Sequence, residues 1–422
     1  MNKADIKVNV VKEKYKYWIM YIYSALIILV GFLMNSFQEI HNGIYKIVLS
    51  PSFLITDYFA LGGIGASLVN SGILMILSTL IGQISKTSMS GSLIAAIFTV
   101  GGFALFGKNI YNVISIVLGV YLYCLIKKEN FSKHITVALF GTALAPVVSQ
   151  LSFGMSLNPF LGIVLGNIVG IFIGLALSPL AASFVKFHQG FNLYNIGFTA
   201  GIVGMVLMSL FRSTGYNHDI VSNVYIKTEI SLVVFFILYF ISMLALGCVL
   251  AKNNISNYRK LLNFKIKSAT DFVDLGGFSL AIFNMGVLGL ISTAIVLIFK
   301  APLNGPIIGG IFTVVGFGAF GKHPKNSLPV MAGVIIGYLL MGVSLGTTGA
   351  ILTVLFSTTL APIAGYYGSG AGILAGLMHV SLISNTGYLH GGMNLYNNGF
   401  TGGFVAAVLV LLFQAYNKKH SD

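Results

Sequence analysis

Long apolar runs, separated by short polar or glycine-rich breaks, occupy nearly the whole chain. A helix needs roughly 20 apolar residues to cross the hydrocarbon of a bilayer, and this pattern predicts about seven such segments in each half. Short, glycine-rich segments are candidates for half-length or re-entrant helices, so we expect about 12–14 transmembrane helices in an all-α membrane protein. The predicted segments are 17–37, 58–81, 90–107, 110–126, 134–154, 157–181 and 190–211, then 230–251, 274–299, 304–321, 326–342, 346–364, 367–388 and 391–415.

Four sequence blocks of the first half recur, in the same order, in the second. The two longest pairs are MSGSLIAAIFTVGGFALFGKN (89–109) with LNGPIIGGIFTVVGFGAFGKH (303–323), and HQGFNLYNIGFTAG (188–201) with HGGMNLYNNGFTGG (390–403). DYFALGG (57–63) likewise returns as DFVDLGG (271–277), and ALFGTALAP (138–146) as VLFSTTLAP (354–362). Such self-similarity indicates a duplication. It predicts a cytoplasmic N-terminal segment at 1–16, a first membrane repeat at 17–213, a connecting loop at 214–229, a second membrane repeat at 230–415 and a cytoplasmic tail at 416–422.

Composition supports a membrane protein and excludes a soluble one. Hydrophobic residues make up 56% of the chain and charged residues 8%, whereas soluble domains carry about 25% charged residues. A net charge of +14 does not indicate nucleic-acid binding here, because the basic residues gather in the breaks between apolar runs, as topology signals do. Cys124 and Cys248 match neither a metal-binding spacing nor a disulfide framework.

The charges of matched loops predict that the two halves have opposite orientations. KKENFSKH at 127–134 corresponds to the uncharged GVSLGTTG at 342–349, and the lone Lys108 corresponds to the KHPK cluster at 322–325. With seven crossings per half the basic clusters fall on one face, which the positive-inside rule makes cytoplasmic, together with both termini. Inverted-topology repeats are typical of secondary transporters, which bind their solute between the repeats.

The NLYN blocks carry the most specific candidate site. Asn192, Asn195 and Thr199 have the spacing of one helical face, and the second half repeats that spacing. Buried amides are costly unless they pair with protein, water or solute. We therefore expect these groups to line a solute path; the alternative is that they only bond neighbouring helices. The predicted solute-binding residues are Asn192, Tyr194, Asn195, Thr199, Asn394, Tyr396, Asn397 and Thr401.

Three further matched pairs are candidates for gating or ion coupling. The histidines precede the NLYN blocks and fit either a local hydrogen bond or a proton relay. The acids open glycine-rich segments and fit either an interfacial anchor or a counter-charge for a cation. The asparagines share an Asn-x-Gly pattern with Asn195 and Asn397, which suggests a polar ring; His379 has no counterpart and no assigned role. The pairs are His188 with His390, Asp57 with Asp271, and Asn70 with Asn284.

The duplicated HxGxNLYNxGFTxG block resembles a bacterial multi-pass membrane-protein family of unknown function. The resemblance covers most of the chain and implies a membrane fold without implying a substrate. By analogy of architecture the chain is also similar to the nucleobase and anion transporters with seven-plus-seven segments, and to the urea channels. The L-P-x-x-T-x-P-F signature of urea channels is missing; TALAP and TTLAP, at Pro146 and Pro362, are its nearest equivalents.

Together these features predict a transporter or channel for a small polar solute or monovalent ion in a bacterial cytoplasmic membrane. The scarcity of acidic residues in the apolar runs favours a neutral solute or sodium held by amide and carbonyl oxygens. No catalytic cluster, metal site or cofactor is expected, and a homo-oligomer is compatible with this interpretation. Two alternatives stay open: a membrane-embedded enzyme acting on lipid, in which a histidine and an acid would share a pocket, and a non-transporting scaffold subunit.

Overall fold

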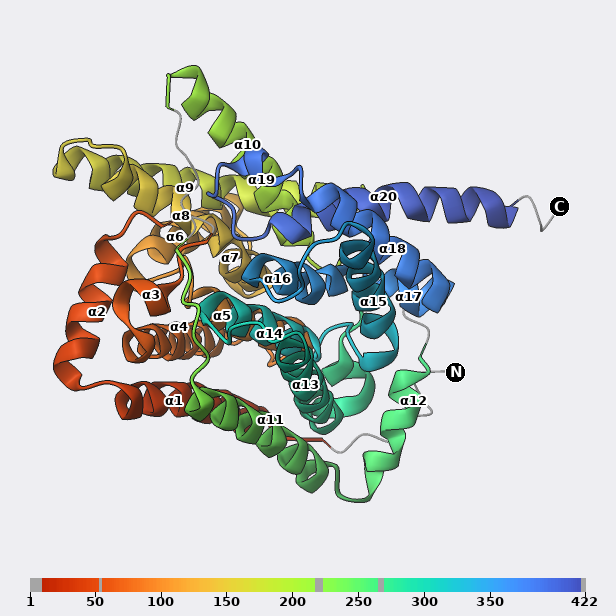
Figure 1. Cartoon of the computed structure of the whole chain (residues 1–422). Helices are drawn as coiled ribbons and strands as arrows, with labels where there is room; N and C mark the ends of the chain where they lie inside the picture. Colours follow the sequence, from red (N-terminus) through yellow and green to blue (C-terminus); the bar gives the residue numbers. More distant parts are fainter. Residues whose placement is uncertain (1–9, 53–54, 217–222, 265–268, 419–422) are drawn as a thin grey trace.

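The computed structural model describes residues 10–52, 55–216, 223–264 and 269–418, and these residues form a bundle of α-helices (Figure 1). The first half contains α1 (Glu13–Met34), α2 (Phe37–Leu49), α3 (Tyr58–Gly62), α4 (Ile64–Ile84), α5 (Gly91–Phe103), α6 (Ile110–Lys127), α7 (Ile135–Gly141), α8 (Ala145–Ser149), α9 (Pro159–Phe184) and α10 (Asn195–Ser213). The second contains α11 (Ile230–Ala251), α12 (Tyr258–Leu262), α13 (Phe272–Ile298), α14 (Gly305–Phe317), α15 (Pro324–Leu340), α16 (Thr348–Phe356), α17 (Ala361–Tyr367), α18 (Ser369–Ile383), α19 (Gly387–His390) and α20 (Asn397–Lys418).

Within the described residues, ten helical stretches are long and apolar enough to cross a membrane. Their outward surfaces carry large apolar side chains, such as Leu33, Phe160 and Ile230, which are 75–78% exposed. A soluble protein does not leave so much apolar surface in water. The chain is therefore a multi-pass membrane protein, as its composition predicts.

The predicted segments appear as single helices or as runs of short helices, and several of them differ at their ends. The run predicted at 17–37 ends at Met34, and a separate helix, α2, follows it. Ser36 caps α2 by accepting from the backbone N–H of Glu39, whose side chain bonds back to Ser36. The segment predicted from 190 becomes α-helical only at Asn195.

Helices at matching positions in the two halves pack in matching pairs. α1 lies against α4 as α11 lies against α13, and α6 lies against α9 as α15 lies against α18. Two further pairs join the halves, namely α5 with α14 and α10 with α20. The duplicated sequence therefore produces the same neighbour relations twice, and matched helices of the two halves meet in the contact between them.

α5 and α14 form the centre of the molecule. Each has 13 residues, or roughly 20 Å of helix, which is shorter than a bilayer core. All 13 residues of α14 are buried. The helices pack with opposite ends together: Gly91, which begins α5, meets Ala319 just after α14, whereas Leu105 meets Gly305. Between these ends Gly102 lies so close to Gly309 that a methyl group on either would come within 2.6 Å of the other's carbonyl oxygen.

Candidate functional site

The chain turns sharply after α5 and again after α14, and the two turns (104–109 and 318–323) are here called the corners. In each corner, an asparagine from a preceding helix of the same half, α4 or α13, donates to two carbonyl groups. Asn70 Nδ2 donates to the carbonyl oxygens of Ala104 (2.7 Å) and Lys108 (2.8 Å). Asn284 Nδ2 makes the equivalent bonds, both 2.7 Å, to the second corner. These two asparagines were candidates for gating or coupling. Their amide groups instead donate to backbone carbonyl groups that have no partner within a helix.

The NLYN blocks begin outside their helices. Asn192 precedes α10, so the prediction that it shares a helical face with Asn195 and Thr199 is wrong. Its side-chain oxygen instead accepts from the backbone N–H of Tyr194 (3.1 Å) and from the Thr359 hydroxyl, and its amide donates to the Gly399 carbonyl (2.9 Å). The physical reason is that a short polar side chain bonding the backbone two residues on favours a turn over a helix.

Asn192 and its counterpart Asn394 are not bonded alike. The side-chain oxygen of Asn394 accepts from the backbone N–H of Tyr396 (3.0 Å), as Asn192 does from Tyr194. The Asn394 Nδ2, however, has no hydrogen-bond partner within the described part of the chain, although the residue is fully buried. The second copy of the block therefore retains a free donor.

The two threonines of the blocks bond within their own helices, whereas Asn195 bonds residues outside α10. Thr199 donates to the Asn195 carbonyl (3.0 Å) and Thr401 to the Asn397 carbonyl (3.1 Å). Asn195 donates to the Ala181 carbonyl (3.1 Å), while its Oδ1 lies 3.0 Å from His188 Nε2. A threonine hydroxyl bonded to the preceding turn has no hydrogen left for a solute.

Tyr194 and Tyr396 meet at the interface between the halves. Their ring centroids lie 5.1 Å apart; Tyr194 packs on Phe317 (4.8 Å) and Tyr396 on Phe103 (4.6 Å). These four rings, here called the aromatic column, run from one corner to the other. Each half thus places its tyrosine beside the phenylalanine of the opposite half.

A buried lysine lies at each end of the aromatic column. Lys322 Nζ donates to the Tyr194 hydroxyl (2.5 Å) and lies 4.4 Å from the centre of the Tyr194 ring. Lys108 Nζ lies 5.1 Å from the centre of the Phe103 ring. Both side chains are 0% exposed. The prediction treated these lysines as charge markers in surface loops; that is wrong, because the corners fold inward between the two halves.

A cavity of about 230 Å³ opens onto the column at this interface. Of the eight predicted solute-binding residues, four line it: Asn192, Tyr194, Asn195 and Tyr396. Thr199, Asn394, Asn397 and Thr401 do not. Both halves contribute to the wall: Ser92 and Thr136 belong to the first half, and Phe317 and Phe320 belong to the second.

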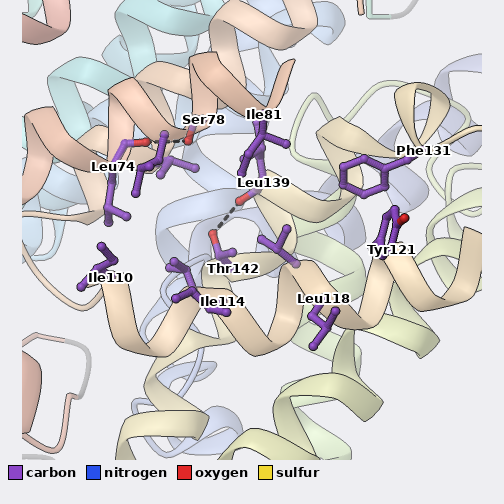
Figure 2. A pocket seen from close by; sticks show the side chains of 14 residues that line it. Leu74, Ser78, Ile81, Ile110, Ile114, Leu118, Tyr121, Phe131, Leu139 and Thr142 are labelled. Carbon is purple, nitrogen blue, oxygen red and sulfur yellow. Dashed lines mark hydrogen bonds between the residues drawn. The ribbon is translucent and has the colours of Figure 1, made fainter. Parts of the chain in front are cut away.

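A larger cavity, of about 510 Å³, lies away from this interface, among α4, α6 and α7 (Figure 2). Its lining is aliphatic and aromatic apart from the hydroxyl groups of Tyr121, Ser78 and Thr142. Ser78 donates to the Leu74 carbonyl and Thr142 to the Leu139 carbonyl, so neither is free for a polar solute. This groove is suited to hydrocarbon, and the candidate solute site stays at the interface.

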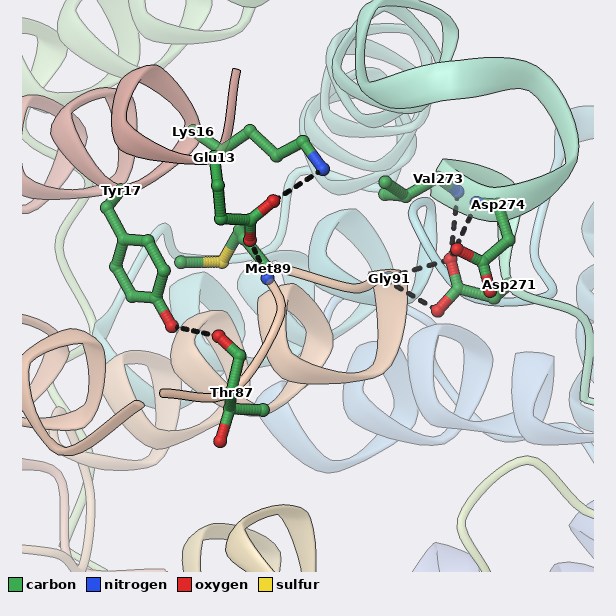
Figure 3. Close-up of polar contacts among 9 residues, drawn as sticks. All are labelled: Glu13, Lys16, Tyr17, Thr87, Met89, Gly91, Asp271, Val273 and Asp274. Atoms are coloured by element: carbon green, nitrogen blue, oxygen red, sulfur yellow. Dashed lines mark hydrogen bonds and ion pairs between the residues drawn. The ribbon is translucent and has the colours of Figure 1, made fainter. Parts of the chain in front are cut away.

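Asp57 and Asp271 each cap a helix of the opposite half. Asp271 accepts from the backbone N–H of Gly91, at the start of α5, at 2.8 Å, and also from that of Val273 (Figure 3). Asp57 accepts from the N–H of Tyr225 (2.9 Å) and of Gly305, at the start of α14. A carboxylate at a helix N-terminus satisfies free N–H groups. This arrangement supports the anchoring interpretation of these acids.

The histidines are buried beside the NLYN blocks. Burial lowers the pKa of His188, and it lowers the pKa of His390 to about 4. Both rings are therefore neutral at pH 7. His379 Nε2 lies 2.9 Å from Asn398 Oδ1. Within the described residues no group of three or more His, Cys, Asp or Glu side chains is placed to hold a metal ion.

The residues that sequence reasoning missed are Lys108 and Lys322. A signal for them was present, because they recur at the same offset along the chain as Asp57 with Asp271 and as Asn70 with Asn284. Their charge was attributed to loops at the membrane surface, whereas the positional match indicated a conserved place in the duplicated fold.

Comparison with known proteins shows the family of this chain but not an activity. No curated protein and no solved structure matches it. One family model does match, in two segments that cover residues 36–213 of the first half and 250–415 of the second. These segments include both NLYN blocks and both corners. The chain therefore belongs to the DUF1576 family, described as a protein of unknown function.

Proposed function

We propose that this protein is a transporter or channel that carries a small polar solute or ion across the membrane between its two halves. The observation that carries the proposal is the interface cavity of about 230 Å³, whose lining includes Tyr194 and Tyr396. Transporters built from two repeats bind solute at such an interface. Asn192 and Asn195 supply polar groups to a wall that is otherwise largely apolar.

The two halves have opposite orientations in the membrane under this proposal. Support comes from the antiparallel packing of α5 on α14, since helices at equivalent positions in parallel repeats would run in the same direction. It also comes from α1 and α11: the Tyr239 hydroxyl donates to the Tyr23 carbonyl (3.3 Å), and Ser231 lies beside Met34. The start of α11 therefore meets the end of α1.

The cytoplasmic face is assigned by its lysines. Lys12 and Lys252 line one surface hollow, and the start of α1 lies beside the loop after α4, because the Tyr17 hydroxyl donates to the Thr87 carbonyl (2.6 Å). Lys325 bonds Asn263 on the same face. The last turn of α20 and helix α12 also lie on one side of the molecule, opposite α2 (Figure 1). The positive-inside rule makes this face cytoplasmic, in a bacterial cytoplasmic membrane.

Uptake into proteoliposomes tests the proposal. The assay uses a variant in which Cys124 and Cys248 are replaced by serine and Ser92, in the cavity wall, by cysteine. Solute or ion flux should be present and should fall after a bulky thiol reagent is added. The same reagent should not change the flux through a Ser381→Cys variant, because Ser381 is exposed on α18. Absence of flux for a panel of neutral solutes, cations and anions would favour the scaffold alternative.

A further inference from the structure

Lys108 and Lys322 are the two fully buried lysines of the described residues. They occupy matching positions in the two halves and follow α5 and α14 directly. A lysine inside a membrane protein is costly and normally pairs with a carboxylate, a carbonyl or water. The groups around Lys108 and Lys322 therefore indicate which kind of ligand they could bind.

No carboxylate balances either lysine among the described residues. The ion pairs there join Lys16 to Glu13 and His134 to Glu129. The repeat-matched acids Asp57 and Asp271 are occupied by backbone N–H groups. Aromatic rings offset part of the cost of burying an ammonium group, but they do not neutralise its charge.

Buried donors without partners occur on and beside the first corner. Lys108 Nζ has no hydrogen-bond partner in the described part of the chain, and neither does the amide nitrogen of Asn394. The segment that carries Asn394 and Tyr396 lies against the first corner, since Leu395 packs on Gly107. Buried donors without partners are suited to an anion, and an anion bound beside Lys108 would favour the charged form of its amine.

We propose that Lys108 and Lys322 bind the transported solute and that this solute is a small anion, of the halide, nitrate or short carboxylate class. This inference rests on the proposed function and narrows it. It replaces the preference for a neutral solute or sodium, which was based on the scarcity of acids and took no account of buried lysines.

The cavity gives an anion a route to the first of these lysines. Tyr194 lines the cavity, and its hydroxyl accepts a hydrogen bond from Lys322 Nζ. An anion that displaces this hydroxyl binds Lys322 and lies on one side of the aromatic column. Lys108 provides the equivalent position on the other side. The two lysines thus mark successive positions on a path through the interface.

Anion-dependent melting of the purified full chain in detergent tests the inference directly. Sodium chloride, nitrate and acetate are each titrated against sodium gluconate at constant ionic strength. A bound anion stabilises the folded form, so we expect a saturable rise in melting temperature. The rise should vanish in the Lys108→Met/Lys322→Met double variant and persist in Lys325→Met, because Lys325 is exposed three residues after Lys322.

The readout is the anion-dependent shift and not the melting temperature itself, since replacing a buried ammonium by methionine can stabilise the protein. Lys322→Arg keeps the charge and should retain the shift, with a half-saturating concentration raised about tenfold, which corresponds to about 1.4 kcal/mol. If the methionine variants do not fold, calorimetric titration of the wild-type protein with chloride and nitrate measures anion binding without them.

Two results would overturn the inference: absence of anion binding by the wild-type protein in both measurements, or a full anion-dependent shift in the double methionine variant. The proposed function fails separately. Anion binding without flux in proteoliposomes would retain the site and remove transport, whereas flux of a neutral solute without anion binding would retain transport and remove the anion.

Discussion

At the scale of residues, buried polar side chains in this protein serve two different purposes. Asn70 and Asn284 hold the corners by donating to carbonyl groups that no helix satisfies. Lys108 and Lys322, on those same corners, are not paired with any carboxylate. A repeated polar residue in an apolar sequence can therefore be a structural bond or a ligand group. Only the partners in the structure distinguish the two.

Replacing Asn70 or Asn284 by alanine should destabilise the protein. Each substitution leaves two buried carbonyl groups unsatisfied, at about 1–3 kcal/mol per group, and Asn284→Ala also removes the bond from the Tyr258 hydroxyl. The measurement is the melting temperature in detergent. Asn42→Ala, at an exposed position on α2, is the matched control and should change the stability by less than about 0.5 kcal/mol. An Asn70→Ala variant as stable as this control would contradict the role assigned to the corner bonds.

Lowering the pH below about 6.5 should destabilise the protein. Because burial lowers the pKa of His390 to about 4, the folded state binds fewer protons than the unfolded state between these values. Stability is then complete above the ordinary histidine pKa and decreases by up to about 1.4 kcal/mol per pH unit on acidification. Melting temperatures from pH 8 to 4.5 measure this. His390→Gln should reduce the slope, whereas His41→Gln, at an exposed position, should leave it unchanged.

At the scale of elements, the apolar pattern predicted most helices well because membrane helices must satisfy their own backbone. The segment predicted at 230–251 coincides with α11. The pattern failed where side chains bond the backbone, as at Asn192. It also missed α2, an amphipathic helix in which polar residues such as Glu39 and Lys46 interrupt the apolar sequence. Contacts between halves, such as Asp271 with Gly91, carry no local signal and could not be predicted.

The contact between α5 and α14 should tolerate no side chain at its centre. Gly102→Ala or Gly309→Ala would place a methyl group within 2.6 Å of a carbonyl oxygen on the facing helix. The helices would have to separate, at a cost of about 1–3 kcal/mol. The melting temperature should fall, and flux should fall with it. Gly370→Ala is the control, since nothing lies within 4 Å of its added methyl group. Equal stability of the three variants would show that the helices are not in close contact.

At the scale of the whole molecule, the two halves depend on each other at several matched motifs. Each caps a short helix of the other through an aspartate, and each tyrosine of the aromatic column packs on a phenylalanine from the opposite half. The duplicated blocks were visible in the sequence, but their convergence on one interface was not. Neither half could form its site alone, because the cavity wall and the lysine environment contain residues of both.

Opposite orientation of the halves can be tested at Lys86 and Lys300, which occupy matching positions after α4 and α13 and are both exposed. Lys86 directly precedes Thr87, which bonds the start of α1, so it belongs to the face assigned as cytoplasmic. Single cysteines at the two positions, in a chain whose native cysteines are serines, should react with a membrane-impermeant thiol reagent from opposite sides. A cysteine at Lys252 should react from the same side as one at Lys86, because Lys252 lies beside Lys12.

The corners themselves are unsuitable for such labels because they are buried. If cysteines at Lys86 and Lys300 react from the same side, the halves are parallel, and a path formed by inverted repeats is excluded.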